Sequence, residues 1–131
     1  MGLFSKYKLK HKVDGDLLRV VYSGKLTRVE MEEIMNKIYK LIRENKINKL
    51  LIDATGSDLK LELNESLAMA NQQPEELKFV RTAIIEKKSK ADQYKMFEMF
   101  VANREFAMHF FNNAIEAEKW LFQKKESVIT S

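Results

Sequence analysis

Leu50-Leu51-Ile52-Asp53 is the stretch of sequence that decides the fold. Three consecutive apolar residues closed by an acid predict a short strand that is buried on both sides, because a strand with one wet face would alternate apolar and polar residues. Such a strand lies at the centre of a sheet with helices packed against both faces. The next residues, Ala54-Thr55-Gly56-Ser57-Asp58, are expected to form a loop.

The residues before this strand predict an antiparallel hairpin and a helix. Apolar and polar residues alternate over 7–13 and again over 18–22, on either side of the turn sequence Asp14-Gly15-Asp16. Thr27 and Glu30 then form a capping box, which starts a helix. The apolar positions of this helix recur at helical spacing and are Met31, Ile34, Met35, Ile38, Leu41 and Ile42.

The residues after the expected loop alternate between helices and strands. Asn64 is expected to cap a helix that turns Leu67 and Ala70 inward and stops at Pro74. The later elements are expected as a strand at 79–85, a helix from Ser89 to about Asn103, a strand at 106–110 and a helix from Asn113 to near Phe122.

This order of elements predicts an α/β domain. We expect a mixed, mainly parallel sheet of about five strands, with an opening antiparallel hairpin and about four helices. A single domain over 1–131 is expected, with its core at about 7–122 and a loose tail at 123–131.

The composition is that of a small globular protein. A 45% share of hydrophobic residues with 32% charged residues is ordinary for a packed domain. No apolar run approaches the roughly 18 residues that span a bilayer. The chain has no cysteine, which fits a reducing compartment. We therefore expect a cytoplasmic domain without stable membrane insertion.

Positive charge is concentrated near the N-terminus. Four lysines precede the first acid and equal the whole net charge of +4, namely Lys6, Lys8, Lys10 and Lys12. Because the excess is local, nucleic acid is not an expected partner. Lysines on an edge strand prevent edge-to-edge aggregation. The alternative is weak association with a membrane surface, since Leu3, Phe4 and Tyr7 adjoin the basic run.

No metal, cofactor or catalytic site is expected. His11 and His109 belong to different expected strands without the spacing of zinc ligands, and no nucleophile elbow or phosphate-binding glycine loop occurs. Asp53 ends a strand, as the phosphoacceptor of receiver domains does, but Asp14 and Asp16 fall in a hairpin and cannot assemble the Mg²⁺ site that this chemistry needs. Asp53 is expected to accept backbone N–H bonds and to shape the turn toward Gly56.

Apolar residues exceed one narrow face of the helix expected at 89–103. They are Tyr94, Met96, Phe97, Met99, Phe100 and Val101. Most of them are expected in the core. Adaptable methionine and aromatic side chains also suit a ligand cavity or a subunit interface. Met69, Phe97 and Phe100 are therefore candidate walls of an apolar pocket, and a homodimer is a candidate assembly.

Three segments together carry a family resemblance. They are Ser23-Gly24-Lys25-Leu26-Thr27, Leu50-Leu51-Ile52-Asp53-Ala54-Thr55-Gly56 and Phe110-Phe111-Asn112-Asn113-Ala114-Ile115-Glu116-Ala117-Glu118-Lys119-Trp120-Leu121. In order and spacing they resemble the SpoIIAA-like branch of the STAS superfamily, close to the CRAL-TRIO lipid-binding fold. The resemblance covers roughly Tyr7 to Leu121 and implies a STAS-like architecture.

The resemblance also implies a function exerted by binding. In anti-sigma-factor antagonists of this superfamily, a partner kinase phosphorylates a serine at the helix start after this loop, and the new charge switches docking. Ser57 and Ser66 would be the local phosphorylation sites, without the usual Asp-Ser-Ser-Gly context. The expected surface for a protein partner or a small apolar ligand comprises Asp53, Thr55, Gly56, Ser57, Asp58 and Ser66. The alternative is a carrier of a lipid or other apolar molecule, and neither interpretation involves catalysis.

Overall fold

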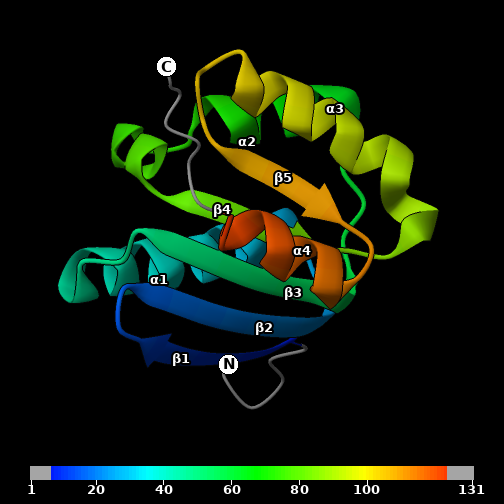
Figure 1. The fold of residues 1–131 in the computed structure, drawn as a ribbon. Helices are drawn as coiled ribbons and strands as arrows, with labels where there is room; N and C mark the ends of the chain where they lie inside the picture. Colours follow the sequence, from blue (N-terminus) through cyan, green and yellow to red (C-terminus); the bar gives the residue numbers. More distant parts are fainter. Residues whose placement is uncertain (1–6, 124–131) are drawn as a thin grey trace.

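The computed structural model describes residues 7–123 as five strands and four α-helices (Figure 1). In chain order they are β1 (Tyr7–Asp14), β2 (Leu17–Lys25), α1 (Arg28–Asn45), β3 (Lys49–Asp58), α2 (Leu63–Asn71), β4 (Arg81–Ile85), α3 (Ala91–Ala102), β5 (Met108–Phe111) and α4 (Ala114–Leu121). Short 3₁₀ helices at Glu75–Phe79 and Lys88–Lys90 precede β4 and α3. Beyond Gln123, the tail expected to be loose lies outside the described residues.

The five strands form one mixed sheet in the order β1-β2-β3-β4-β5. β1 and β2 are antiparallel, and every later neighbouring pair is parallel. The central position of β3 and the α/β class are therefore confirmed. The hairpin turns at Gly15, whose φ of 62° lies in the left-handed region that favours glycine.

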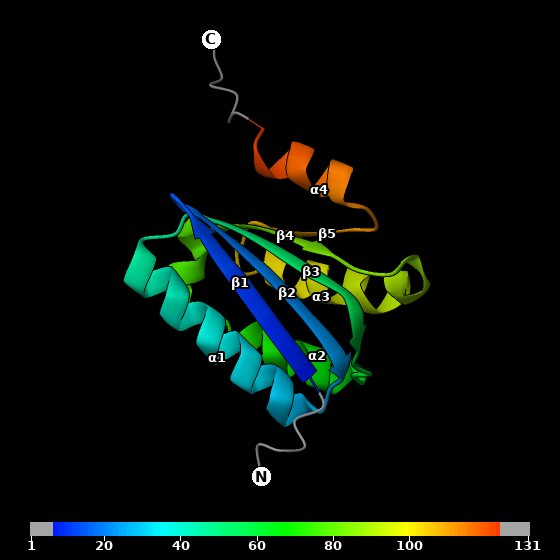
Figure 2. The same ribbon diagram turned by 90° about the horizontal axis from the view of Figure 1, so that it is seen from below.

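Helices cover both faces of the sheet unequally. Figure 2 shows α1, α2 and α3 on one face and α4 alone on the other. The larger face carries the main core, built around residues such as Leu18, Ile34 and Leu50. The α4 face carries a smaller cluster in which Leu51 packs with residues of α4. Leu50 and Leu51 thus point to opposite cores, which explains the continuous apolar run.

The predicted start of α1 is confirmed. The Thr27 hydroxyl accepts a hydrogen bond from the Glu30 N–H at 3.1 Å, and the Glu30 carboxylate accepts one from the Thr27 N–H at 2.9 Å. This reciprocal pair satisfies backbone donors that have no partner inside the helix. The helix ends at Lys46, whose φ of 52° closes it in the left-handed conformation.

The prediction of a loop at 54–58 is wrong, because β3 continues to Asp58. The continuation pairs in parallel with β2, where Ser23, Gly24 and Lys25 lie opposite Gly56, Ser57 and Asp58. The register shifts between Val21 and Ser23, where β3 has one residue more than β2 and so forms a bulge. Pairing with a distant strand therefore overrides the local turn preference of Gly56.

The start of α2 also differs from the prediction. Glu62, not Asn64, is the N-cap, and its N–H donates to the Glu65 carboxylate at 2.9 Å. Ser66 and Ala70 lie on the buried face, whereas the side chain of Leu67 is 42% exposed. The apolar character of Leu67 therefore did not identify the inner face of this helix.

Two later boundaries are shifted. The strand expected from Phe79 begins at Arg81, because Glu75–Phe79 forms a 3₁₀ helix with Pro74 at its N-cap. Phe79 is 83% exposed and belongs to that turn. Ser89 lies in the 3₁₀ turn before α3 and is not its N-cap, which is Lys90. The predicted cap of α4 is correct, since Asn113 accepts the Glu116 N–H at 2.9 Å.

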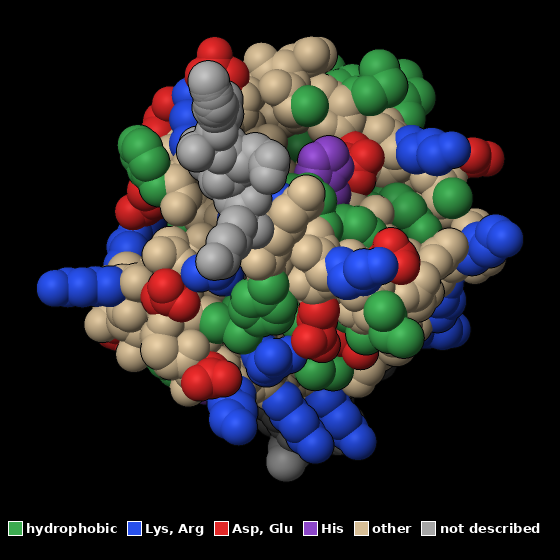
Figure 3. All heavy atoms as spheres, viewed as in Figure 1, with side chains coloured by type: hydrophobic (Ala, Val, Ile, Leu, Met, Phe, Trp, Pro, Cys, Tyr) green, Lys and Arg blue, Asp and Glu red, His purple; other side chains and the backbone are tan. Residues whose placement is uncertain are grey.

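β1 is an edge strand whose lysines face solvent. Lys8, Lys10 and Lys12 are exposed, and Figure 3 shows Lys and Arg side chains gathered along the edge where β1 lies. This placement agrees with protection of a sheet edge. Lys6, Leu3 and Phe4, on which the membrane-surface alternative depended, lie outside the described residues. In the described part of the chain, no helix is long and apolar enough to cross a membrane.

Candidate functional site

The central strand loses one neighbour halfway along its length. β4 pairs with β3 only from Lys49 to Asp53, whereas β2 accompanies β3 as far as Asp58. The chain leaves β4 after Ile85, so β3 and β4 separate at the carboxyl edge of the sheet. In open α/β sheets this edge is where ligands bind.

Asp53 stabilises the backbone at the point of separation. Its Oδ1 atom accepts the Thr55 N–H at 3.0 Å and the Thr55 hydroxyl at 2.7 Å. The predicted acceptance of a backbone N–H is therefore present, but it supports a strand and not a turn. Gly56 packs so closely on β2 that a Cβ atom there would lie 2.9 Å from the Cβ of Ser23. Its lack of a side chain permits this approach of the two strands.

A cavity of about 100 Å³ lies beside the separation, between the sheet and the helices of the larger face. Its wall draws on every element from β2 to β5. The apolar and aromatic wall residues include Met31, Met35, Leu50, Ile52, Leu59, Leu61, Met69, Leu77, Ile84, Phe97, Met108 and Phe110. The candidate wall residues Met69 and Phe97 are thus part of it. Phe100 packs against the core but does not line the cavity.

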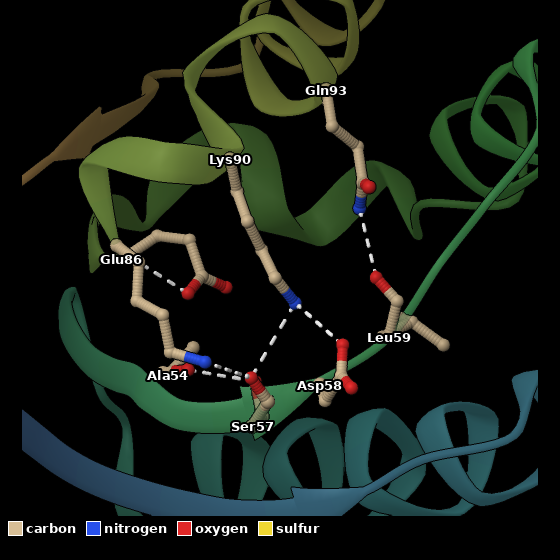
Figure 4. Close-up of polar contacts among 8 residues, drawn as sticks. Ala54, Ser57, Asp58, Leu59, Glu86, Lys90 and Gln93 are labelled. Carbon is tan, nitrogen blue, oxygen red and sulfur yellow. Dashed lines mark hydrogen bonds and ion pairs between the residues drawn. The ribbon is translucent and has the colours of Figure 1, made fainter.

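Two lysines and a glutamine hold the segment that follows β3 (Figure 4). Lys87 Nζ and Lys90 Nζ both donate to the Ser57 carbonyl, at 3.2 Å and 3.4 Å. Lys90 Nζ also lies 3.4 Å from Asp58 Oδ1. Gln93 Nε2 donates to the Leu59 carbonyl at 3.2 Å. The segment that leads into α3, together with Gln93 of its first turn, therefore fixes residues 57–59 over one side of the cavity.

Glu86 is the acid in the cavity wall. It follows β4 directly and is 9% exposed, and its Oε1 atom accepts the Lys87 N–H at 2.9 Å. Burial raises the pKa of this carboxyl; the Lys87 N–H and the lysine charges oppose the rise, and Asp53 adds to it. Burial also raises the pKa of Tyr22, and Glu86 adds to that shift. Tyr22 comes from β2 opposite the bulge of β3, whereas Glu86 follows β4, so the two groups approach the cavity from separate segments.

Three polar atoms of the wall have unused hydrogen-bonding capacity. No partner is found within residues 7–123 for the hydroxyls of Tyr22 and Ser66 or for Glu86 Oε2. In the same residues, no side-chain nitrogen or oxygen that is sealed from solvent lacks a partner. These three atoms therefore face open space and not packed protein.

Both candidate phosphorylation sites are buried in this region. Ser57 is 2% exposed and its hydroxyl donates to the Ala54 carbonyl at 2.7 Å, while Ser66 is 3% exposed. Both line the cavity. A kinase would reach either hydroxyl only if the segment at 57–66 moved away from the sheet. Of the expected surface residues, Gly56 and Asp58 are exposed and Thr55 is half-buried.

A second pocket of about 260 Å³ lies between α1 and the end of α2. Polar residues dominate its wall, and it shares Met35, Met69 and Gln73 with the inner cavity. The Tyr39 hydroxyl donates to Gln73 Oε1 at 3.4 Å across the two helices, and burial raises the pKa of Tyr39 to about 12. Met35, Met69 and Gln73 thus form a shared wall between the cavity and the second pocket.

The predicted histidines lie apart and each has an ordinary setting. His11 is exposed on β1, and His109 packs edge-on against Trp120 with a ring separation of 4.8 Å. His109 Nδ1 lies 3.6 Å from Glu98 Oε2. Among the described residues, no group of three or more His, Cys, Asp or Glu residues is placed to hold a metal ion.

Sequence reasoning missed Glu86, Tyr22 and Lys90. Glu86 carried a readable signal, because it is an acid directly after an expected strand, as Asp53 is. The carboxyl-edge argument applied to Asp53 would have found it. Tyr22 and Lys90 had no such signal, since their proximity to Glu86 depends on strand order.

The described residues form a small α/β domain with one mixed sheet and a cavity at its carboxyl edge. The SpoIIAA-like family model matches residues 17–122, and the chain belongs to that family. No curated protein sequence matches the chain significantly. The recognised resemblance to SpoIIAA-like domains is thereby confirmed.

Two solved structures share this fold. One is an anti-sigma factor antagonist from Mycobacterium paratuberculosis, with a TM-score of 0.57, 13% identity, and coverage of 88% of this chain and 93% of that chain. The other is an uncharacterised protein with a SpoIIAA-like fold from Shewanella loihica, with a TM-score of 0.54, 23% identity and the same coverage. At these identities the likeness establishes the architecture.

Proposed function

We propose that this chain is a non-catalytic regulatory domain that binds a small, largely apolar ligand in the cavity beside β3. The observation that carries the proposal is the position of the cavity under residues 57–66. Ser57, Leu59, Leu61 and Ser66 form part of its wall, so a bound molecule would press on that segment. Concave apolar sites with few polar groups are typical of ligand binding.

The size of the cavity favours a small ligand over a long lipid. Drug-sized ligands occupy sites of roughly 300–1,000 Å³, and an apolar cavity of roughly 150 Å³ accepts benzene. A space of about 100 Å³ accommodates a group of ring size or smaller. The carrier alternative therefore applies to short apolar molecules unless the wall between the two pockets opens.

A protein partner is the second candidate, and a feature of α2 favours it. Leu63 and Leu67 are 57% and 42% exposed on successive turns of the helix that follows the cavity segment. The likeness to an anti-sigma factor antagonist supports a docking role for this region. Phosphorylation of Ser57 or Ser66, a homodimer and a cytoplasmic location stay predictions.

Methyl NMR of the methionines tests ligand binding, with benzene as the probe. Met31, Met35, Met69 and Met108 line the cavity, whereas Met96 and Met99 are exposed on α3 and serve as internal controls. We expect saturable shifts of the four cavity methyl groups with little change in the two controls. Uniform shifts, or none at saturating benzene, would contradict the proposal.

A further inference from the structure

We propose that the cavity is selective for a small amphipathic amine, whose ammonium group pairs with Glu86 and whose apolar part occupies the space beneath α2 and α3. This inference rests on the proposed function and names the chemical class of its ligand. It follows from three features of the wall, which are an incompletely bonded carboxylate, adjacent aromatic rings and the pairing of the nearby lysines.

One carboxylate oxygen of Glu86 can accept a further hydrogen bond inside a largely apolar site. Oε1 is used by the Lys87 N–H, and Oε2 has no partner among the described residues. Because Oε2 faces the open space of a largely apolar cavity, a donor that binds there completes the hydrogen bonds of this carboxylate. A charged donor is favoured most, because N⁺–H···O⁻ bonds are about twice as strong as neutral ones.

Aromatic rings flank the same end of the cavity. Tyr94 stacks on Phe110 at a ring separation of 4.7 Å, and Phe97 meets Phe110 edge-on at 6.1 Å. The Tyr94 hydroxyl donates to the Lys87 carbonyl at 3.0 Å, which places this ring beside the residue that follows Glu86. Aromatic faces attract an ammonium group, and the attraction grows when the site is desolvated.

The lysines near Glu86 are already engaged. Lys87 and Lys90 both donate to the Ser57 carbonyl, and Lys90 is also paired with Asp58. An anionic head group in the cavity would meet the charges of Glu86 and Asp53 and would compete with the Ser57 carbonyl and Asp58 for these lysines. An amine leaves them intact. The hydroxyls of Tyr22 and Ser66 also line the cavity and keep acceptor capacity for an N–H donor.

Three six-carbon probes separate the head-group classes, namely hexylamine, hexan-1-ol and hexanoate. Isothermal titration calorimetry at neutral pH is expected to give hexylamine at least about tenfold tighter binding than hexan-1-ol, with hexanoate weakest. Equal or tighter binding of hexan-1-ol or hexanoate would overturn the inference while leaving the proposed function standing. If none of the three probes binds and benzene does not bind either, the proposed function fails as well.

The variant Glu86→Gln tests the assigned residue. It keeps the shape and the acceptor for the Lys87 N–H but removes the charge, so hexylamine is expected to lose about tenfold in affinity and hexan-1-ol to change little. Glu44→Gln is the matched control, because Glu44 is exposed on α1 and does not line the cavity. Circular dichroism confirms that both variants are folded. Retention of the amine preference in Glu86→Gln would refute the role of this carboxylate.

Discussion

The two halves of β3 are built from one continuous strand but have different surroundings. From Lys49 to Asp53 the strand is paired on both sides, and Leu50, Leu51 and Ile52 are buried. From Ala54 to Asp58 it is paired with β2 alone, and β4 has turned away. The backbone of the first half is hydrogen-bonded to a strand on each side, and its side chains pack into the cores on both faces of the sheet. The cavity lies beside the point where the two halves meet, with Leu50 and Ile52 of the first half and Ser57 of the second in its wall, so a binding site arises where the sheet becomes incomplete.

The first half should be the more sensitive to truncation. Leu51→Ala removes a side chain that is 6% exposed and packs in the cluster beneath α4. We expect the free energy of unfolding to fall by about 2–5 kcal/mol, measured by urea denaturation. Leu63→Ala is the control, since the same change at a side chain that is 57% exposed should cost less than about 0.5 kcal/mol. Equal losses would break the comparison.

Gly56→Ala should show that the second half depends on close strand approach. The added Cβ would lie 2.9 Å from Ser23 Cβ, and we expect a loss of about 1–3 kcal/mol in urea denaturation. Gly15→Ala meets nothing within 4 Å but has a φ of 62°, so its cost of about 1–2 kcal/mol is conformational. Ser23→Gly should rescue Gly56→Ala and leave Gly15→Ala unimproved. Failure of that rescue would mean that the contact does not set the cost.

Lys90→Met should loosen the second half without unfolding the domain. The lysine contacts Ser57 and Asp58 at 3.4 Å, and its side chain is 16% exposed. We expect a global loss below about 1 kcal/mol, but faster hydrogen exchange of the amides at 57–62. Lys88→Met is the control, because Lys88 is exposed in the adjacent turn. Unchanged exchange at 57–62 would show that this contact does not hold the segment.

Glu86→Gln should change the pH dependence of stability. Burial raises the pKa of Glu86 in the folded protein, so its stabilising contribution is present below the pKa of the unfolded chain and is lost as pH rises through the folded value. Relative to the variant, the wild-type melting temperature should therefore fall as pH rises from roughly 4 to 8, a range that starts near the ~4.3 of an unperturbed glutamate. Comparing the two melting temperatures at each pH removes the contributions of the other carboxylates. Parallel curves of melting temperature against pH for the wild type and the variant would contradict the assignment of this pH dependence to Glu86.

Local sequence signals predicted much of the fold. The Asp14-Gly15-Asp16 turn, the capping box at Thr27 and Glu30 and the cap at Asn113 are each made by residues close in sequence, and all three are present. The candidate site was predicted less well. The sequence identified Asp53 and Gly56 as structurally important. The turn predicted there is wrong, because these residues pair with β2 and extend β3. Ser66 and Met69 do line the cavity, and Phe100 does not.

The sequence by itself determined the order of elements, the central buried strand and the family, because alternation, helical spacing and caps act over a few residues. Only the tertiary structure decided where β3 loses its second neighbour and what gathers there. Tyr22, Ser66, Glu86 and Phe110 come from four different segments. Their meeting depends on strand order and on a bulge in β3 opposite Tyr22, and such long-range pairing leaves no periodic trace in the sequence.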